Sequence, residues 1–434
     1  MRKVSALLSM VVFCLLPSGL IAQSDPAQKG AALLHDATDG RFALHLEERT
    51  RWEEKYGVNF GKAVNQQDML SRLRIGMSYK PASWFTISGM GQDARAPWYG
   101  PNAPSSLRES MDLQEAYVAL GPEKQPWSFS FGRRMLNYGE TRVIGVPQWS
   151  NTSRTYDYGR AEYATKRFTL DALLASPVMI LPDSFNNPEL GNRYWGTYDA
   201  FPRLWRGMSV DVYALRHSQN AIGGWTGAGT LGTNSYGARF YGSLPAQFAY
   251  SLEGIGQNGH IGTLDQRAYA WFAGVKHPVR LGRFPVDMSA EYKEASGSHY
   301  GETHSSTFDQ LSPANHDKFG HEDLFGWRNL RTFKSLETAR LTRALAFNVM
   351  YTNESLFSAS DSLYNSSGSK ISISSHGTAG RGVGQELDGF ATCKWGAHTF
   401  YAGFGHFFRG EFVEHTTPGI NPRYFYIAQE YTIK

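Results

Sequence analysis

Cysteine is almost absent from this 434-residue chain, which contains two. Charged residues are few (19%), and the hydrophobic share (41%) lies below the roughly 45–50% of an average soluble domain. No uninterrupted apolar run of 18 or more residues follows residue 22, which excludes a helical membrane protein. A disordered chain is excluded because 14% of the residues are aromatic. The 45 glycines and the thinly spread hydrophobicity are typical of a large β structure, either soluble or facing lipid.

The N-terminus has the layout of a secretory signal peptide. A basic pair precedes the mostly apolar stretch Val4–Leu16, and Ala22 offers a cleavage site. We therefore expect residues 1–22 to be a signal peptide and residues 23–434 to be the mature, exported protein.

Removal of this segment has two consequences. Cys14 is lost and Cys393 is left alone, so no intramolecular disulfide is predicted. The net charge falls from +4 to +2, because Arg2 and Lys3 leave with the segment. A chain so close to neutral has no strongly basic field, and we expect no nucleic-acid partner.

Hydrophobic residues recur at every second position in segments of about 10 to 13 residues. In residues 42–53, apolar side chains such as Leu44 and Trp52 alternate with charged ones such as Arg49 and Arg51, and only Glu48 breaks the pattern. Strands of soluble sheets are shorter, at about 5 or 6 residues, whereas a transmembrane barrel needs strands of this length with one apolar face. The same alternation occurs in residues 68–79, 127–132, 167–174 and 284–293.

Aromatic residues at the segment ends suit the two interfacial girdles of such a barrel. A secreted β-sandwich or propeller is the alternative, although no period of 20–50 residues repeats in the sequence. The expected girdle residues are Tyr79, Trp84, Tyr117, Trp127, Tyr163, Trp205, Trp271, Tyr292, Tyr351, Trp395 and Tyr431.

Strand direction predicts the number of strands. Short turns face the periplasm and long loops face outwards, so successive strands must alternate in direction. Sixteen strands are read directly; direction then requires one more at 190–200 and another near 325–334. The sequence thus predicts an all-β, antiparallel transmembrane barrel of about 18 strands. The short turns are expected at residues 80–82, 121–125, 165–166, 244–246, 278–282 and 396–397.

Several motifs of the chain resemble those of the alginate export family of Gram-negative outer-membrane β-barrels. The resemblance covers essentially the whole mature chain and implies an 18-stranded channel in the outer membrane that is not an enzyme and holds no cofactor. For the alginate-secreting member it implies an arginine-rich constriction with acidic partners, but most relatives have no assigned cargo. The motifs are QDAR at 92–95, FGRRMLNYGETR at 131–142, RTYD at 154–157 within 149–160, FDQLSPANH at 308–316, FGHED at 319–323 and GWRN at 326–329.

One feature departs from the usual pattern of barrel proteins. The chain ends in Lys434, where an aromatic residue is common, although Tyr431 and Ile433 keep the outward period. We therefore expect an intact last strand with an atypical signal for the barrel assembly machinery.

Charged residues on the polar faces of the predicted strands are the candidates for the pore. Arginine suits a channel for anions because its planar guanidinium binds carboxylate bidentately and stays charged. The alternative is that these charges pair with one another and merely stiffen the wall. The candidate cations are Arg49, Arg51, Arg72, Arg74, Arg134, Arg142, Arg160 and Arg239; the candidate anions are Glu47, Asp93, Asp171, Asp211, Glu253, Asp287 and Glu291.

Two long loops carry family motifs, at 139–154 and 308–329. Each either folds inwards and narrows the pore or forms an extracellular cap, and the sequence does not decide between these. His316, His321, Glu322 and Asp323 are possible metal ligands, but a solvated loop is favoured. Residues 254–259 match GxGxxG and are interpreted as strand, because no helix follows.

The sequence predicts an outer-membrane channel that passes hydrophilic, anionic solutes or polysaccharide by passive diffusion through an arginine-lined lumen. The expected partners are outer-membrane lipid, the barrel assembly machinery and the anionic solute. Two alternatives stay open: an outer-membrane barrel enzyme of the phospholipase kind and a secreted polysaccharide-binding β protein. No GxSxG elbow favours the enzyme.

Overall fold

The computed structural model describes residues 26–100, 102–121, 125–220 and 229–433. The predicted signal peptide and Lys434 lie outside these described residues. One sheet runs through nearly the whole chain, and its first strand pairs with its last. The described residues therefore form a closed barrel of 18 antiparallel strands, which confirms the predicted fold class.

The described elements include the barrel strands, three short strands outside the barrel, and a few short helices. The barrel strands are β1 (Phe42–Tyr56), β2 (Gln66–Ala82), β3 (Phe85–Arg95), β4 (Glu109–Leu120), β5 (Trp127–Arg134), β6 (Tyr156–Ala164), β7 (Thr169–Met179), β9 (Asn192–Trp205), β10 (Met208–Gln219), β11 (Leu231–Ser243), β12 (Ala249–Ile261), β13 (Leu264–Leu281), β14 (Phe284–Ala295), β15 (Leu330–Arg340), β16 (Leu345–Leu356), β19 (Gly382–Trp395), β20 (His398–Arg409) and β21 (Arg423–Ile433). The others are β8 (Asn187–Pro188), β17 (Ser362–Tyr364), β18 (Lys370–Ile373), α2 (Pro26–Ala37), α3 (Glu411–Thr416) and the 3-10 turns η2 (Val58–Gly61) and η3 (Pro245–Gln247).

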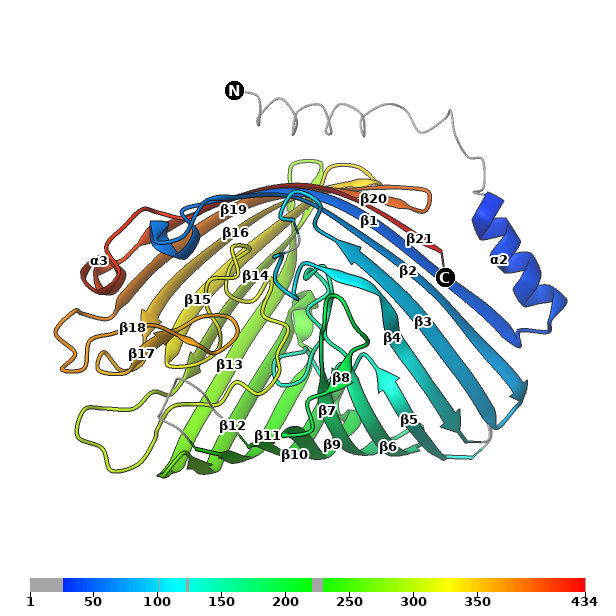
Figure 1. Cartoon of the computed structure of the whole chain (residues 1–434), viewed down its shortest axis with the longest axis horizontal. Coiled ribbons are helices and arrows are strands. Elements are labelled where there is room, and N and C mark those ends of the chain that lie inside the picture. Colours follow the sequence, from blue (N-terminus) through cyan, green and yellow to red (C-terminus); the bar gives the residue numbers. More distant parts are fainter. Residues whose placement is uncertain (1–25, 101, 122–124, 221–228, 434) are drawn as a thin grey trace.

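The two ends of the barrel differ. Long connections gather at one end, where α3 and the β17–β18 hairpin lie, and α2 lies toward the opposite end (Figure 1). We call these the loop end and the turn end. No helix among the described residues has the length and apolarity needed to cross a bilayer.

Alternation of side chains between lumen and outer surface follows the predicted period of two. On β2, Arg72 and Arg74 are 2% and 1% exposed and face the lumen, whereas Leu73 and Ile75 are 37% and 55% exposed on the outer surface. Near the turn end, outward aromatic residues are exposed, which supports the girdle predicted there. They are Trp84, Trp127, Tyr163, Trp205 and Trp395.

The two strands inferred from direction alone are present. The first is β9, which begins two residues after the predicted start. The second is β15, which begins at Leu330, five residues later than predicted. The reason for the delay is that Phe325 and Trp327 are buried and belong to the preceding loop. The GxGxxG segment 254–259 lies within β12, as interpreted.

Gly132 on β5 occupies a position that only glycine fits. Its φ is +128°, and a Cβ built there would lie 2.2 Å from the carbonyl oxygen of Ala116 on β4. A side chain would push apart β4 and β5, which pair at this point.

We predict that Gly132→Ala destabilises the barrel by roughly 1–3 kcal/mol, the usual range for a residue forced into such a conformation. The check is the midpoint of urea unfolding in detergent micelles. Gly159→Ala on β6 is the matched control, because nothing lies within 4 Å of its Cβ position. Equal midpoints for the two variants would contradict the conclusion that only glycine fits at position 132.

Candidate functional site

Two long connections fold into the barrel. The first inner loop (135–155) joins β5 to β6, and the second inner loop (296–329) joins β14 to β15. They meet inside the barrel, where Gly145 N donates to Ser312 O at 2.9 Å and Ser312 N donates to Val143 O at 2.9 Å. Of the two alternatives left by the sequence, inward folding is therefore the one observed.

The arginines of β1 and β2 hold the first inner loop by its backbone. Arg49 donates to the carbonyl oxygens of Gln148 (2.8 Å) and Ser150 (3.0 Å), and Arg72 donates to the same two oxygens at 3.0 and 2.9 Å. Arg51 donates to Trp149 O at 2.6 Å. Because hydrogen bonds to charged groups contribute about 1.5–3 kcal/mol each, this cluster is a strong attachment for the loop.

The same arginines are only partly neutralised by carboxylates. Arg72 and Arg74 both contact Glu47, and Arg51 contacts Glu53 at 2.9 Å. Arg49, Arg51, Arg72 and Arg74 are 1–3% exposed. Carbonyl oxygens accept hydrogen bonds without cancelling charge, so the hydrogen bonds to the loop leave the guanidinium charges in place.

Asn151 adds a second attachment of the loop. Its side chain is fully buried, and its amide nitrogen donates to the carbonyl oxygens of Ser71 (3.0 Å), Arg95 (3.2 Å) and Leu107 (2.8 Å). The asparagine thus ties the loop to β2, the end of β3 and the connection that follows it.

A second charged cluster lies where the first inner loop faces β10, β11 and β12. Arg142 contacts Glu253 at 3.1 Å and Glu140. Arg239 contacts Asp211 at 2.9 Å and Glu140 at 2.9 Å. Glu140 therefore joins an arginine of the loop to an arginine of the wall.

Lysines hold the second inner loop. Lys334 on β15 donates to Asp317 O at 2.7 Å, and Lys293 on β14 donates to Lys318 O. Both ammonium groups lie 3.4 Å from Glu291. As with the arginines, backbone carbonyls of the loop are the acceptors.

Other candidate pore residues make local contacts. Arg160 lies 2.6 Å from Asp171, Asp287 lies 2.6 Å from Arg340, and Arg134 lies over the ring of Tyr117. Their roles in a pore stay predictions.

The prediction that Asp93 lines the pore is wrong. It pairs across β2–β3 with Leu73, which faces outwards, and its carboxylate contacts Arg95 at 2.5 Å on the outer surface. The neighbouring Gln92 faces the lumen instead and is fully buried. The error arose because a charged residue near the loop end was assigned to the polar face without its strand register.

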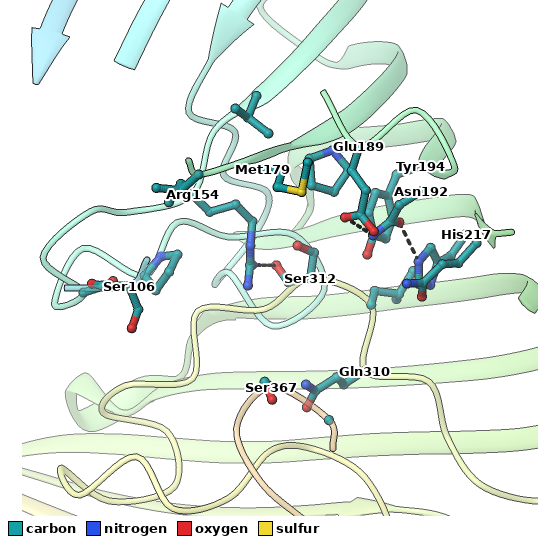
Figure 2. Close-up of a pocket in the computed structure, with 18 of the residues that line it drawn as sticks. Ser106, Arg154, Met179, Glu189, Asn192, Tyr194, His217, Gln310, Ser312 and Ser367 are labelled. Atoms are coloured by element: carbon teal, nitrogen blue, oxygen red, sulfur yellow. Dashed lines mark hydrogen bonds between the residues drawn. The ribbon is translucent and has the colours of Figure 1, made fainter. Parts of the chain in front are cut away.

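Among the described residues, two hollows lie beside the inner loops, and they share no lining residue. The loop-side hollow, of about 600 Å³, is lined by residues that include Arg154, Ser312, Gln310, Tyr194 and His217 (Figure 2). The turn-side hollow, of about 360 Å³, is lined by residues that include Glu140, Lys276, Asp287, Asp317 and Lys334. A solute that crosses the barrel would pass from one hollow to the other across the inner loops.

A chain of polar contacts fixes one wall of the loop-side hollow. His217 Nδ1 lies 2.6 Å from Asp309, its Nε2 lies 3.0 Å from Asn192 Oδ1, and the Asn192 amide donates to Glu189 at 3.1 Å (Figure 2). Burial opposes ionisation of Asp309, but His217 and Arg328 outweigh it and hold its pKa below the usual range.

The segment that offered metal-ligand types packs inside the barrel and is not the solvated loop that was predicted: one of the four residues is buried and three are half-buried. His321 is 7% exposed and stacks on His316 at 4.9 Å. Glu322 N donates to Glu386 at 3.0 Å, on β19. Burial, together with the Asp388 carboxylate, raises the pKa of Glu322 to about 8. Among the described residues, no group of three or more His, Cys, Asp or Glu could hold a metal ion.

A stack of tyrosines inside the barrel was not predicted from the sequence. Tyr198 stacks on Tyr213 at 5.2 Å and contacts Tyr138 at 5.0 Å; its hydroxyl donates to Asp211 at 2.9 Å. The available signal was the set of inward tyrosines on β9 and β10, namely Tyr194, Tyr198 and Tyr213. Sequence alone could not show that one of the partners comes from a loop.

Comparison with known proteins agrees with this architecture. A family model described as alginate export matches residues 41–426. The chain belongs to the alginate export family. The family and the closed 18-stranded barrel place it in the outer membrane as a channel-forming protein. No curated protein matches it in sequence.

Solved structures of outer-membrane proteins share the fold of this alginate export family member. OccD3 (OpdP) of Pseudomonas aeruginosa is 11% identical, with a TM-score of 0.62 over 90% of this chain and 91% of that chain. OccAB1 of Acinetobacter baumannii is 9% identical, with a TM-score of 0.58 over 90% and 96%. OpdK of P. aeruginosa, solved with vanillate, is 9% identical, with a TM-score of 0.58 over 90% and 98%.

We predict that Arg49→Ala combined with Arg72→Ala releases the first inner loop of this alginate export family member. The double variant loses five hydrogen bonds to loop carbonyls, so single-channel conductance in a planar bilayer should rise at least twofold and become noisier. Arg95→Ala, on the outer surface, is the control. Unchanged conductance in a folded double variant would refute the attachment.

The second inner loop should respond to pH through Glu322. An exposed glutamate ionises near 4.5, whereas the packed one has a raised pKa of about 8. Between about pH 4.5 and pH 8, Glu322 is ionised when the loop is released but protonated when the loop is packed. Packing of the loop therefore becomes less favourable as the pH rises through this range, and it does not change further above about pH 8.

We expect wild-type thermal stability to fall between pH 5 and 8 more steeply than that of Glu322→Gln. Thermal unfolding followed by circular dichroism measures this, with Glu414→Gln on the exposed part of α3 as the control. Parallel pH profiles for wild type and Glu322→Gln would contradict the raised pKa of Glu322.

Proposed function

We propose that this barrel is a passive channel for small hydrophilic solutes that carry negative charge. The observation that carries the proposal is the pair of hollows on the two sides of the inner loops, together with the guanidinium groups at the contacts between those loops and the wall. Such an arrangement needs neither ATP nor a cofactor, since the solute moves down its own gradient.

Two arginines that contact a carboxylate of the turn-side hollow are the proposed selectivity elements. Arg142 and Arg239 are 6% exposed, and Glu140, 42% exposed by its side chain, lies between them and also lines the turn-side hollow. An anion that displaces Glu140 would find two planar cations in place, and bidentate pairing favours carboxylates. The mixed charge would keep binding weak enough for release, as conduction requires.

The size of the loop-side hollow supports small solutes. About 600 Å³ lies within the range of roughly 300–1,000 Å³ found for small-molecule sites. Arg154 lines this hollow, with one amino group on the carbonyl oxygens of Ser312 (3.0 Å) and Pro313 (3.2 Å) (Figure 2). A barrel of the same fold, OpdK, was solved with the small organic anion vanillate, which fits the proposed class of solute.

We predict an anion preference that depends on Arg142 and Arg239. In a planar bilayer with a tenfold salt gradient, the wild-type reversal potential should have the sign of anion selectivity. Arg142→Gln combined with Arg239→Gln should reduce anion-to-cation permeability severalfold, because two cations beside Glu140 are removed.

The control is Arg133→Gln on the outer surface, where Arg133 contacts Asp157 at 2.7 Å. Absence of conductance above background would refute the channel function itself. A wild-type cation preference would leave the channel intact and reject the anionic solute.

A further inference from the structure

A row of polar side chains crosses the outer surface of four adjacent strands at the loop end. The register aligns Arg216 on β10 with Asn234 on β11, Asn234 with Asn258 on β12, and Asn258 with Arg267 on β13. Arg216 donates to Asn234 Oδ1 at 2.7 Å, and Asn234 donates to Asn258 Oδ1 at 2.9 Å. The amides are therefore held in place with an arginine at each end of the row.

The row faces outwards and not into the lumen. The neighbours in sequence, His217, Ser235, Gln257 and Gln266, are buried on the inner side. Alternation along a strand then turns the members of the row to the outer surface. The row plays no part in the hollows described above.

The position of the row along the barrel is that of lipid headgroups. Two residues closer to the membrane centre, β11 and β13 carry Tyr236 and Tyr269, which are 55% and 44% exposed on the same face. Aromatic residues of a barrel mark the edge of the hydrocarbon layer, so the next outward residue on each strand lies among the headgroups.

The charge of the row suits an anion at each end. Arg267 is exposed, and its side chain has no ion pair or hydrogen bond among the described residues. Exposed Arg193 on β9 lies one strand from Arg216 and one step further out, whereas Asp265 is a carboxylate two residues from Arg267. The row ends are three strand spacings apart, or about 14 Å.

A neighbouring arginine provides the contrast. Arg331 on β15 also faces outwards, but it donates to Glu294 at 2.7 Å, and Glu294 accepts from Tyr269 at 3.2 Å. This arginine is already neutralised by the protein itself.

We propose that the row binds the phosphorylated headgroup of a glycolipid in the outer leaflet. Arg216 and Arg267 would each pair with a phosphate, because the guanidinium fork matches phosphate oxygens. The amides of Asn234 and Asn258 between them would bind sugar hydroxyls. A headgroup with a phosphate at each end of a disaccharide has this order of groups.

The test is native mass spectrometry of the purified, folded barrel with added diphosphoryl lipid A. We expect wild type to keep a bound lipid, and Arg216→Gln combined with Arg267→Gln to bind at least tenfold more weakly. Arg331→Gln should bind like wild type, since its charge is already paired. Conductance of all three should be equal, which separates this binding from solute passage.

Two probes identify the recognised chemistry. Lipid A stripped of both phosphates should bind wild type as weakly as the double variant binds the intact lipid. Equal binding of the stripped and intact lipids would overturn the proposal, as would full binding by a double variant that keeps wild-type unfolding temperature. The proposal would also be overturned, in favour of a simple anion site, if inorganic phosphate at low millimolar concentration displaced the lipid and no lipid stayed bound.

Discussion

Hydrogen bonds from guanidinium groups to loop carbonyls are the interaction on which the interior of this barrel depends. A sheet of 18 strands encloses more space than its inward side chains fill, so something must occupy the lumen. Arg49, Arg51 and Arg72 solve this by holding residues 148–150 against β1 and β2. Buried arginines cannot lose their charge, and without these acceptors they would be strongly destabilising in this position.

The rest of the interior is built on that attachment. The first inner loop presents Val143 and Gly145 as a partner edge for Ser312, so the second inner loop is supported by the first. Lysines of β14 and β15 then hold the second loop from the other side.

Sequence predicted the wall of the barrel well and its contents poorly. Period-two alternation and strand direction are local constraints, so β9 could be located from direction alone. Arg142 was recognised as a candidate, but its partner Glu253 lies on β12, far along the chain, and the link through Glu140 could not be foreseen. Asp93 was misplaced because polarity alone does not give register. His321 was predicted to be solvated because a loop rich in polar residues is typically exposed. The sequence does not show that this loop packs against β19.

The acceptors at the main attachment are peptide carbonyls, which every amino acid supplies. The loop can therefore exchange many of its side chains, for example at Ser150, without losing the bonds to Arg49 and Arg72. A barrel built this way separates the anchoring of its constriction from the chemistry that the constriction displays. Such a division would let related proteins diverge in what they admit while the same few wall arginines keep the pathway assembled.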